Sequence, residues 1–184
     1  MPNRWEMPAL YLQSGDPETE NTPSLQYPGQ LGMRITVRQP PGGAVGAEAG
    51  RSKRYQLIQT DSTMSVAPFR GAVAWWSDKT KYLVTTSPTA LGRGRIAGVF
   101  QNAISAGYYG CVQIEGPATV KFVDAPTAAP TAAGLFVIPS ATAGKADCLA
   151  AASAATHPTL GVSAGVYDAA QAEAVVDLNV PETT

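Results

Sequence analysis

One serine of the sequence stands in a spacing that is typical of a hydrolase nucleophile. Gly161, Ser163 and Gly165 match the G-x-S-x-G pattern, in which a strained strand-to-helix turn lifts a serine over an oxyanion hole. The catalytic histidine follows the serine in that arrangement, but His157, the single histidine of the chain, precedes Ser163. The pattern also arises by chance in a chain rich in Gly and Ala. We therefore expect no catalytic residues and no enzymatic activity.

Residue types that bind metals are few and scattered. Cys111 and Cys148 lie outside any CxxC or Cys/His cluster, so we interpret both as buried free thiols, with a disulfide between them as the alternative. Asp16, Glu18 and Glu20 lack the glycine-turned spacing of a calcium loop and are interpreted as a solvated segment. These patterns predict no metal site.

Two further motifs have a structural interpretation. The glycines at 92, 94 and 98 are one residue too widely spaced for G-x-G-x-x-G and lead into an expected strand, so we expect a turn and no cofactor. Trp75 and Trp76 are adjacent, and adjacent strand residues point to opposite faces. We expect one of them in the core and the other exposed or at an interface.

Composition limits the classes of function. The 184-residue chain is 45% hydrophobic and 15% charged, against roughly 25% charged residues in an average soluble protein. Its net charge of −1 gives no basic excess for displacing counterions from phosphates, so we expect no direct nucleic-acid binding. No run of 18 apolar residues and no signal-peptide pattern is present, so we expect a soluble, cytoplasmically made product that has no contact with membranes.

Charge is unevenly distributed along the chain. Residues 1–100 hold 11 basic and 7 acidic side chains, whereas residues 101–184 hold 2 basic and 7 acidic ones. A cluster of five basic residues is opposed by Glu48 alone. This basic cluster is either a solvated segment or a segment that docks on an acidic protein surface, such as the C-terminal half of a neighbouring copy. Its members are Arg34, Arg38, Arg51, Lys53 and Arg54.

Short apolar runs separated by turn residues predict an all-β fold. Cys111–Glu115 and Thr119–Val123 both alternate, and the Gly-Pro between them predicts a hairpin turn over 114–119. The one helix-compatible stretch is 147–156. The pattern is typical of a β-sandwich or barrel of short antiparallel strands with little helix. The expected strands are Met33–Arg38, Tyr55–Thr60, Gly71–Trp76, Lys81–Thr86, Ile96–Gln101, Cys111–Glu115, Thr119–Val123, Leu135–Ile138, Ala146–Ala150, Leu160–Val166 and Ala174–Val180.

Residues 1–53 differ from the β-rich domain that we place at 54–184. They hold 7 of the 15 prolines and 7 of the 18 glycines, which excludes long helices and central strands. Aromatic and branched side chains are nevertheless scattered through the segment, and disordered tails are poor in these. We therefore expect an extended N-terminal arm that becomes ordered by lying on another surface.

The β-rich region resembles head decoration or capsid-stabilising (cement) proteins of tailed bacteriophages. The resemblance runs through 55–86, 95–122 and 160–181, and its most specific part is 97–120, where AGVF is followed by AGYYG and VQIEG. The arm is not matched in detail. Such proteins bring no catalytic residues, so none are carried over.

The resemblance implies a β-rich, often trimeric protein on the outside of an icosahedral shell. We expect a virion structural protein on the capsid surface, made in the bacterial host cytoplasm, that binds major capsid subunits and stabilises the shell by bridging them. The alternative is a β-sandwich head-fibre or tail-associated module that binds host-surface carbohydrate through Trp75, Trp76 or the Tyr108-Tyr109 pair. The arm aromatics could instead pack on their own domain. The expected partner-binding residues are Trp5, Tyr11, Leu12, Tyr27, Arg34 and Arg38.

Overall fold

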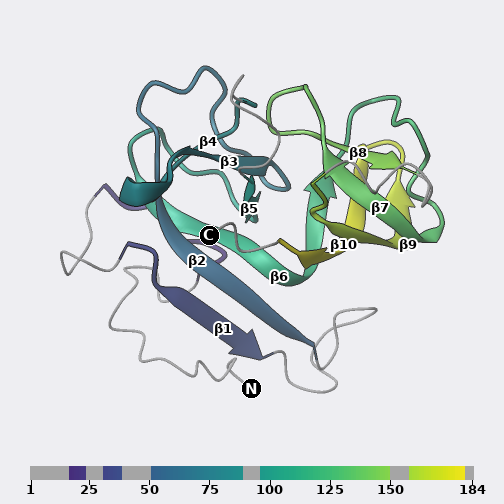
Figure 1. Cartoon of the computed structure of the whole chain (residues 1–184), viewed down its shortest axis with the longest axis horizontal. Helices are drawn as coiled ribbons and strands as arrows, with labels where there is room; N and C mark the ends of the chain where they lie inside the picture. Colours follow the sequence, from purple (N-terminus) through teal and green to yellow (C-terminus); the bar gives the residue numbers. More distant parts are fainter. Residues whose placement is uncertain (1–16, 24–30, 39–50, 89–95, 150–157, 181–184) are drawn as a thin grey trace.

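The computed structural model of the chain describes residues 17–23, 31–38, 51–88, 96–149 and 158–180 (Figure 1). These residues form ten β-strands and one 3-10 helix, η2, with no α-helix among them. The elements are β1 (Arg34–Arg38), β2 (Ser52–Thr60), β3 (Val73–Asp78), η2 (Lys79–Lys81), β4 (Leu83–Thr85), β5 (Ile96–Phe100), β6 (Tyr109–Lys121), β7 (Ala133–Pro139), β8 (Ala146–Leu149), β9 (Gly161–Asp168) and β10 (Glu173–Asn179).

Five strands close into a barrel. The strands pair in the order β2-β4-β3-β5-β6, and β6 also pairs with β2, which completes the ring. The β2–β4 pairing is parallel and the others are antiparallel. The prediction of an all-β fold of short, mainly antiparallel strands is confirmed.

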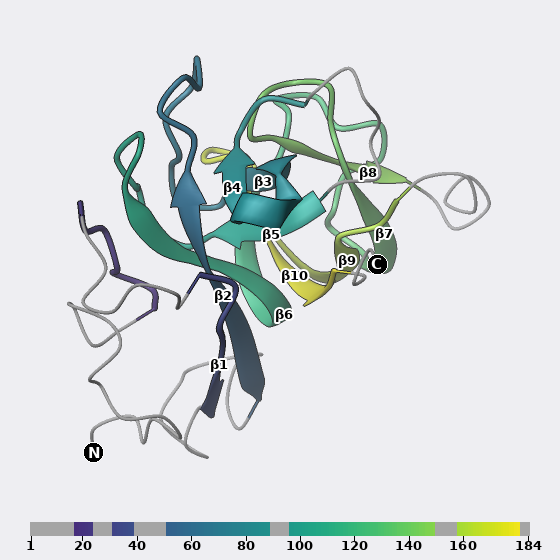
Figure 2. The same cartoon turned by 60° about the vertical axis from the view of Figure 1, so that its left-hand side comes forward.

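A second sheet continues from the barrel in the order β6-β10-β9-β7-β8. It curls back toward its own start, because Phe122, one residue beyond β6, forms a parallel bridge with Ala146 of β8. Strand β6 therefore belongs to both lobes of the molecule, as Figures 1 and 2 show from two directions.

The predicted hairpin turn at 114–119 is wrong, because β6 is continuous across it. Its first half pairs with β2, and from Glu115 onward it pairs with β10. Gly116, at the change of partner, has φ +86°, and a Cβ atom there would overlap the backbone oxygen of Ser52. The Gly-Pro sequence thus produces a bend within one strand, where a glycine is needed for its positive φ and for the close approach of β2.

The barrel has its own apolar core. All five barrel strands contribute to it, including Ile58 of β2, Val84 of β4 and Val112 of β6. A larger core lies between the second sheet and the outer side of β3 and β5, with Val99, Val120 and Val176 among its members. Strands β3 and β5 lie between the two cores and contribute side chains to both, so both faces of these strands are apolar.

Trp75 and Trp76 are both buried, which corrects the prediction that one of them is exposed or at an interface. Trp75 is 1% exposed and packs in the core beneath the second sheet, whereas Trp76 is 5% exposed and packs inside the barrel. The two side chains do point to opposite faces of β3, as adjacent strand residues must. Each face is covered, because the barrel encloses one and the second sheet covers the other.

The helix-compatible stretch 147–156 begins in a strand. Residues 147–149 belong to β8, where Cys148 pairs with Val137, and residues 150–156 lie outside the described residues. The strand expected at Ala146–Ala150 is therefore present as β8, and the helix-compatible pattern does not form a helix in the described part of the stretch. Cys148 is buried on one face of β8, and that alternation is typical of a strand.

Both described stretches of the N-terminal region lie on the barrel. Strand β1 pairs along β2 over its full length, and Ile35 and Val37 pack with Leu57 of β2 in a third apolar cluster. Residues 17–23 contact β2 and β6, as described below. Strand β2 begins at Ser52, so the boundary that we placed between residues 53 and 54 falls inside a strand.

Candidate functional site

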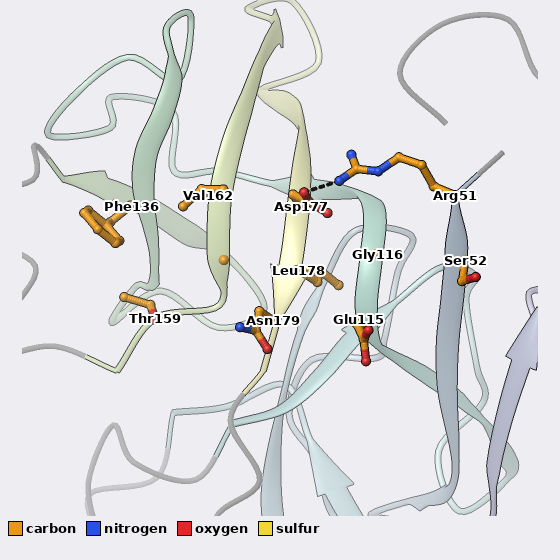
Figure 3. A pocket seen from close by; sticks show the side chains of 11 residues that line it. Arg51, Ser52, Glu115, Gly116, Phe136, Thr159, Val162, Asp177, Leu178 and Asn179 are labelled. Carbon is orange, nitrogen blue, oxygen red and sulfur yellow. Dashed lines mark hydrogen bonds and ion pairs between the residues drawn. The ribbon is translucent and has the colours of Figure 1, made fainter. Parts of the chain in front are cut away.

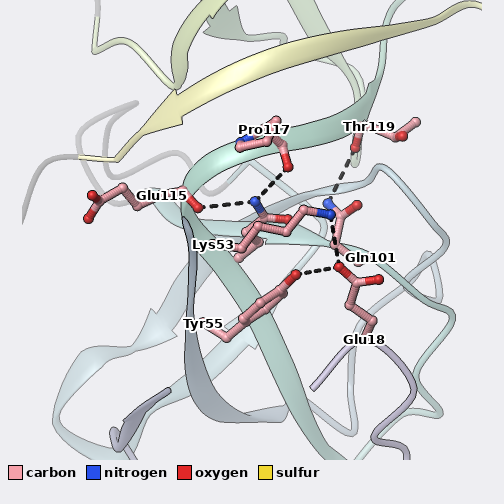
Figure 4. Close-up of polar contacts among 8 residues, drawn as sticks. Glu18, Lys53, Tyr55, Gln101, Glu115, Pro117 and Thr119 are labelled. Carbon is pink, nitrogen blue, oxygen red and sulfur yellow. Dashed lines mark hydrogen bonds and ion pairs between the residues drawn. The ribbon is translucent and has the colours of Figure 1, made fainter. Parts of the chain in front are cut away.

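Glu18 joins the N-terminal region to the barrel through two side chains of β2 (Figure 4). Its Oε1 accepts a hydrogen bond from Lys53 Nζ at 3.1 Å and a short one from the Tyr55 hydroxyl. The Lys53 side chain is only 7% exposed and Tyr55 is buried, whereas the Glu18 side chain is 40% exposed. A nearly buried ammonium group therefore has its charge balanced by a carboxylate from the N-terminal region. We call Glu18, Lys53 and Tyr55 the Glu18 clamp.

The protonation of Glu18 reflects these contacts. Desolvation raises its pKa, but the hydrogen bonds from Tyr55 and Lys53 and the positive charges of Lys53 and Arg70 outweigh it. The net effect holds the pKa of Glu18 below its ordinary value of 4.5, so the carboxylate form is favoured in the folded protein.

Backbone contacts two and four residues after Glu18 reinforce the clamp. Thr22 and Tyr109 exchange two backbone hydrogen bonds, at 3.0 and 2.8 Å. The Glu20 backbone oxygen accepts a hydrogen bond from Asn102 Nδ2 at 3.2 Å. Gly110 permits this close approach, since a Cβ atom there would lie 2.8 Å from the Glu20 oxygen. Residues 17–23 are therefore packed on the barrel.

This arrangement corrects the interpretation of the acidic cluster as solvated. Glu20 is 1% exposed and Glu18 belongs to the clamp, while Asp16 lies outside the described residues. No local sequence pattern indicates this pairing, because the partners of Glu18 are 35 and 37 residues away along the chain.

Four of the six predicted partner-binding residues lie outside the described residues. These four are Trp5, Tyr11, Leu12 and Tyr27. Arg34 and Arg38 are the first and last residues of β1, and Arg34 is exposed. The structure thus places the two arginines on one strand at the outer edge of β2 and does not test whether they bind a partner.

Three members of the basic cluster pair with carboxylates of their own chain. Arg51 pairs with Asp177 of β10, Arg54 with Glu115 of β6 at 2.8 Å, and Lys53 with Glu18. Two of these carboxylates belong to the acidic C-terminal half. These ion pairs within one chain join the start of β2 to residues 17–23 and to both lobes, and docking of the segment on another protein surface stays a prediction.

An open cleft of about 640 Å³ lies where the barrel meets the second sheet (Figure 3). The Arg51–Asp177 ion pair spans one side of it, and both side chains are partly exposed. The apolar side chains of Phe136 and Val162 line the part of the cleft on β7 and β9. The remaining lining comes from Ser52, Glu115, Gly116, Thr159, Gly161, Leu178 and Asn179.

The serine of the G-x-S-x-G pattern is not arranged as a nucleophile. Ser163 lies in the middle of β9, is 2% exposed, and donates its hydroxyl to the backbone oxygen of Ala132 at 2.7 Å. A nucleophile elbow needs an exposed serine at a strand-to-helix turn. His157, the residue that would act as base, lies outside the described residues.

The burial of Trp75 and Trp76 removes two of the aromatic side chains that were expected to stack on carbohydrate. Tyr108 and Tyr109 are each half-buried at the start of β6, and the backbone of Tyr109 is bonded to Thr22. Of the aromatic residues named for that alternative, only this pair keeps exposed surface.

Both cysteines are buried free thiols, as predicted. Burial, together with the negative charge of Asp147, raises the pKa of the Cys148 thiol to about 11. No group of three or more His, Cys, Asp or Glu side chains suited to a metal ion occurs among the described residues. The same part of the chain has no helix with the length and apolar character that crossing a membrane requires.

Comparison of the chain with models of protein families, with characterised proteins and with solved structures gave no match.

Proposed function

We propose that this chain is a virion structural protein that binds the outer surface of a tailed-phage capsid and stabilises it by bridging major capsid subunits. We also propose that the chain forms a homo-oligomer, and the resemblance implies a trimer. Its location would be the capsid surface of a virion that is made in the bacterial cytoplasm. It starts from the sequence resemblance at 55–86, 95–122 and 160–181.

The stretch with the most specific resemblance coincides with the centre of the fold. Residues 97–120 span most of β5 and β6, and β6 is the strand that both lobes share. The residues that most resemble decoration proteins therefore belong to the strands that hold the fold together. This supports the proposal of an all-β structural protein.

The Glu18 clamp is the observation that supports the capsid-binding role most directly. It holds residues 17–23 on the barrel, so the preceding segment with Trp5, Tyr11 and Leu12 starts from a defined point beside β2. A binding segment attached at a defined point samples a small volume, which raises its effective concentration at a neighbouring surface. Many copies on one lattice then act together even where each contact is weak.

Deletion of residues 1–16 tests the proposal, because the cut removes these three anchors and leaves the Glu18 clamp intact. We expect the truncated protein to fold with an unchanged denaturation midpoint but to co-sediment weakly with empty capsids. A full-length variant with Trp5, Tyr11 and Leu12 changed to Ala should behave in the same way. Truncated protein that decorates capsids as tightly as the full chain would show that the N-terminal segment is not the binding element.

The carbohydrate-binding alternative now depends on Tyr108 and Tyr109. A glycan array with the full chain tests it directly, and the variant Y108A serves as the control for any signal. Trp75 and Trp76 do not support it, because both side chains are buried.

A further inference from the structure

The outward face of the second sheet carries apolar side chains on β7, β8 and β9, whereas the outward residues of β10 are mainly polar. Strand β9 shows this most clearly, because Ser163 points inward while Val162 and Val166 point outward, where they are followed by the exposed Asp168 at the end of the strand. Val166 is 56% exposed, and among the described residues it is the one large hydrophobic residue that is exposed. A sheet with one solvated face has the opposite alternation, with apolar residues inside and polar residues outside.

The apolar character extends across neighbouring strands. Leu149 of β8 is in register with Phe136 of β7, Phe136 with Val162 of β9, and Val162 with Asp177 of β10. Residues in register on antiparallel strands share one face of the sheet. The three apolar side chains of this row are half-buried, so they form a surface with partial access to solvent. We call Leu149, Phe136, Val162 and Val166 the outer apolar face.

Charges of both signs border this face on one side. Asp177 continues the row and pairs with Arg51, and Glu115 pairs with Arg54 close by on β6. All four side chains are between 35% and 49% exposed, so each can also meet a partner from outside. The outer apolar face thus has an apolar centre and a mixed-charge rim, which is the composition of a protein–protein interface.

We propose that the outer apolar face is an interface between copies of this chain. A rim that holds two arginines and two carboxylates side by side is complementary to itself, because a second copy can place its arginines against the carboxylates of the first. The net charge of −1 on the whole chain adds little repulsion between copies. The inference deepens the self-association included in the proposed function and does not depend on capsid binding.

The test is the mass of the full chain in solution, measured by light scattering during size exclusion. We expect a stable oligomer for the unchanged protein. Val162→Glu and Val166→Glu each place a carboxylate in the outer apolar face and should reduce the mass to that of a single chain. Val166 is the safer variant for folding, since more than half of its side chain is already in solvent.

Ala103→Glu is the matched control, because Ala103 is exposed in the loop between β5 and β6, on the barrel. It adds the same charge and should leave the oligomer intact. Near-ultraviolet circular dichroism of the buried Trp75 and Trp76 reports whether each variant keeps its fold.

Two results would overturn the inference: a monomeric unchanged protein at every concentration, or V162E and V166E variants that keep the full oligomeric mass. Capsid co-sedimentation of the same samples separates this inference from the proposed function. A monomer that co-sediments overturns the interface and the self-association but leaves the capsid role, whereas an oligomer that dissociates in V166E but never binds capsids overturns the capsid role alone.

Discussion

Lys53 Nζ lies 3.1 Å from Glu18 Oε1, although the two residues are 35 positions apart in the sequence. The ammonium group is almost fully removed from solvent, and an unpaired charge in that position would be strongly unfavourable. The pair therefore makes residues 17–23 part of the packed structure, together with the Thr22–Tyr109 backbone bonds. The segment available for binding a neighbour is correspondingly shorter than residues 1–53.

Replacing Lys53 with Met should destabilise the protein by about 1–2 kcal/mol, because it removes the nearly buried ammonium group that pairs with the Glu18 carboxylate. Urea denaturation gives the change in free energy of unfolding. Arg54→Met is the matched control, since the Arg54–Glu115 pair is 43% and 49% exposed and should contribute about 0.5 kcal/mol or less. Equal losses in the two variants would contradict a special role for the clamp.

Stability should also depend on the protonation of Glu18. Its pKa is lowered in the folded state, so the stabilisation is fully present above the ordinary value of 4.5 and is lost as the pH falls through the folded-state pKa. Unfolding free energies measured at a series of pH values below 4.5 should therefore decline less steeply in Glu18→Gln than in the unchanged protein. Hydrogen bonds from Ser77 and Thr63 also lower the pKa of Asp61. The free energy of unfolding should therefore still decline with falling pH in both proteins. Identical slopes would show that Glu18 does not titrate differently on folding.

Local patterns were sufficient to predict most of the fold. Short apolar runs between turn residues predicted the strands at 55–60, 96–101 and 174–180, each of which the structure contains with small shifts in its ends. The hairpin at 114–119 was wrong because Gly-Pro marks a backbone irregularity without saying whether the chain reverses or only bends. The bend was decided by distant partners, since β2 and β10 each pair with one half of β6.

The candidate surfaces were much less predictable than the strands. The Glu18 clamp joins residues that are far apart in sequence, and no short-range pattern marks a carboxylate as the partner of a particular lysine. The burial of Trp76 depended on barrel closure, which is a property of five strands together. The outer apolar face did leave a signal in Val162, Ser163 and Val166, but which side of β9 points inward is evident only from its packing.

Gly116→Ala should destabilise the protein by more than about 2 kcal/mol, since it combines a left-handed backbone with overlap of the Ser52 oxygen. Gly134→Ala separates the two effects, because Gly134 has nearly the same φ, +85°, and nothing within 4 Å of an added Cβ. That control should lose only about 1 kcal/mol. Denaturant midpoints at equal m-value provide the comparison. If the two alanine variants lose the same stability, close packing of β2 on the bend of β6 does not matter.

The two thiols should be unreactive until the protein unfolds. Burial raises the pKa of Cys148 to about 11, so at pH 8 only about one molecule in a thousand has the reactive thiolate. Cys111 is 1% exposed, which blocks access of a reagent to its sulfur. Titration with a thiol-specific chromogenic reagent should therefore detect almost no thiol in the native protein. In denaturant it should detect two thiols per chain in the unchanged protein and one in the Cys148→Ser variant. Rapid reaction of one thiol in the native protein, absent from Cys148→Ser, would mean that β8 opens readily and that the core beneath the second sheet is less firmly closed than its packing indicates.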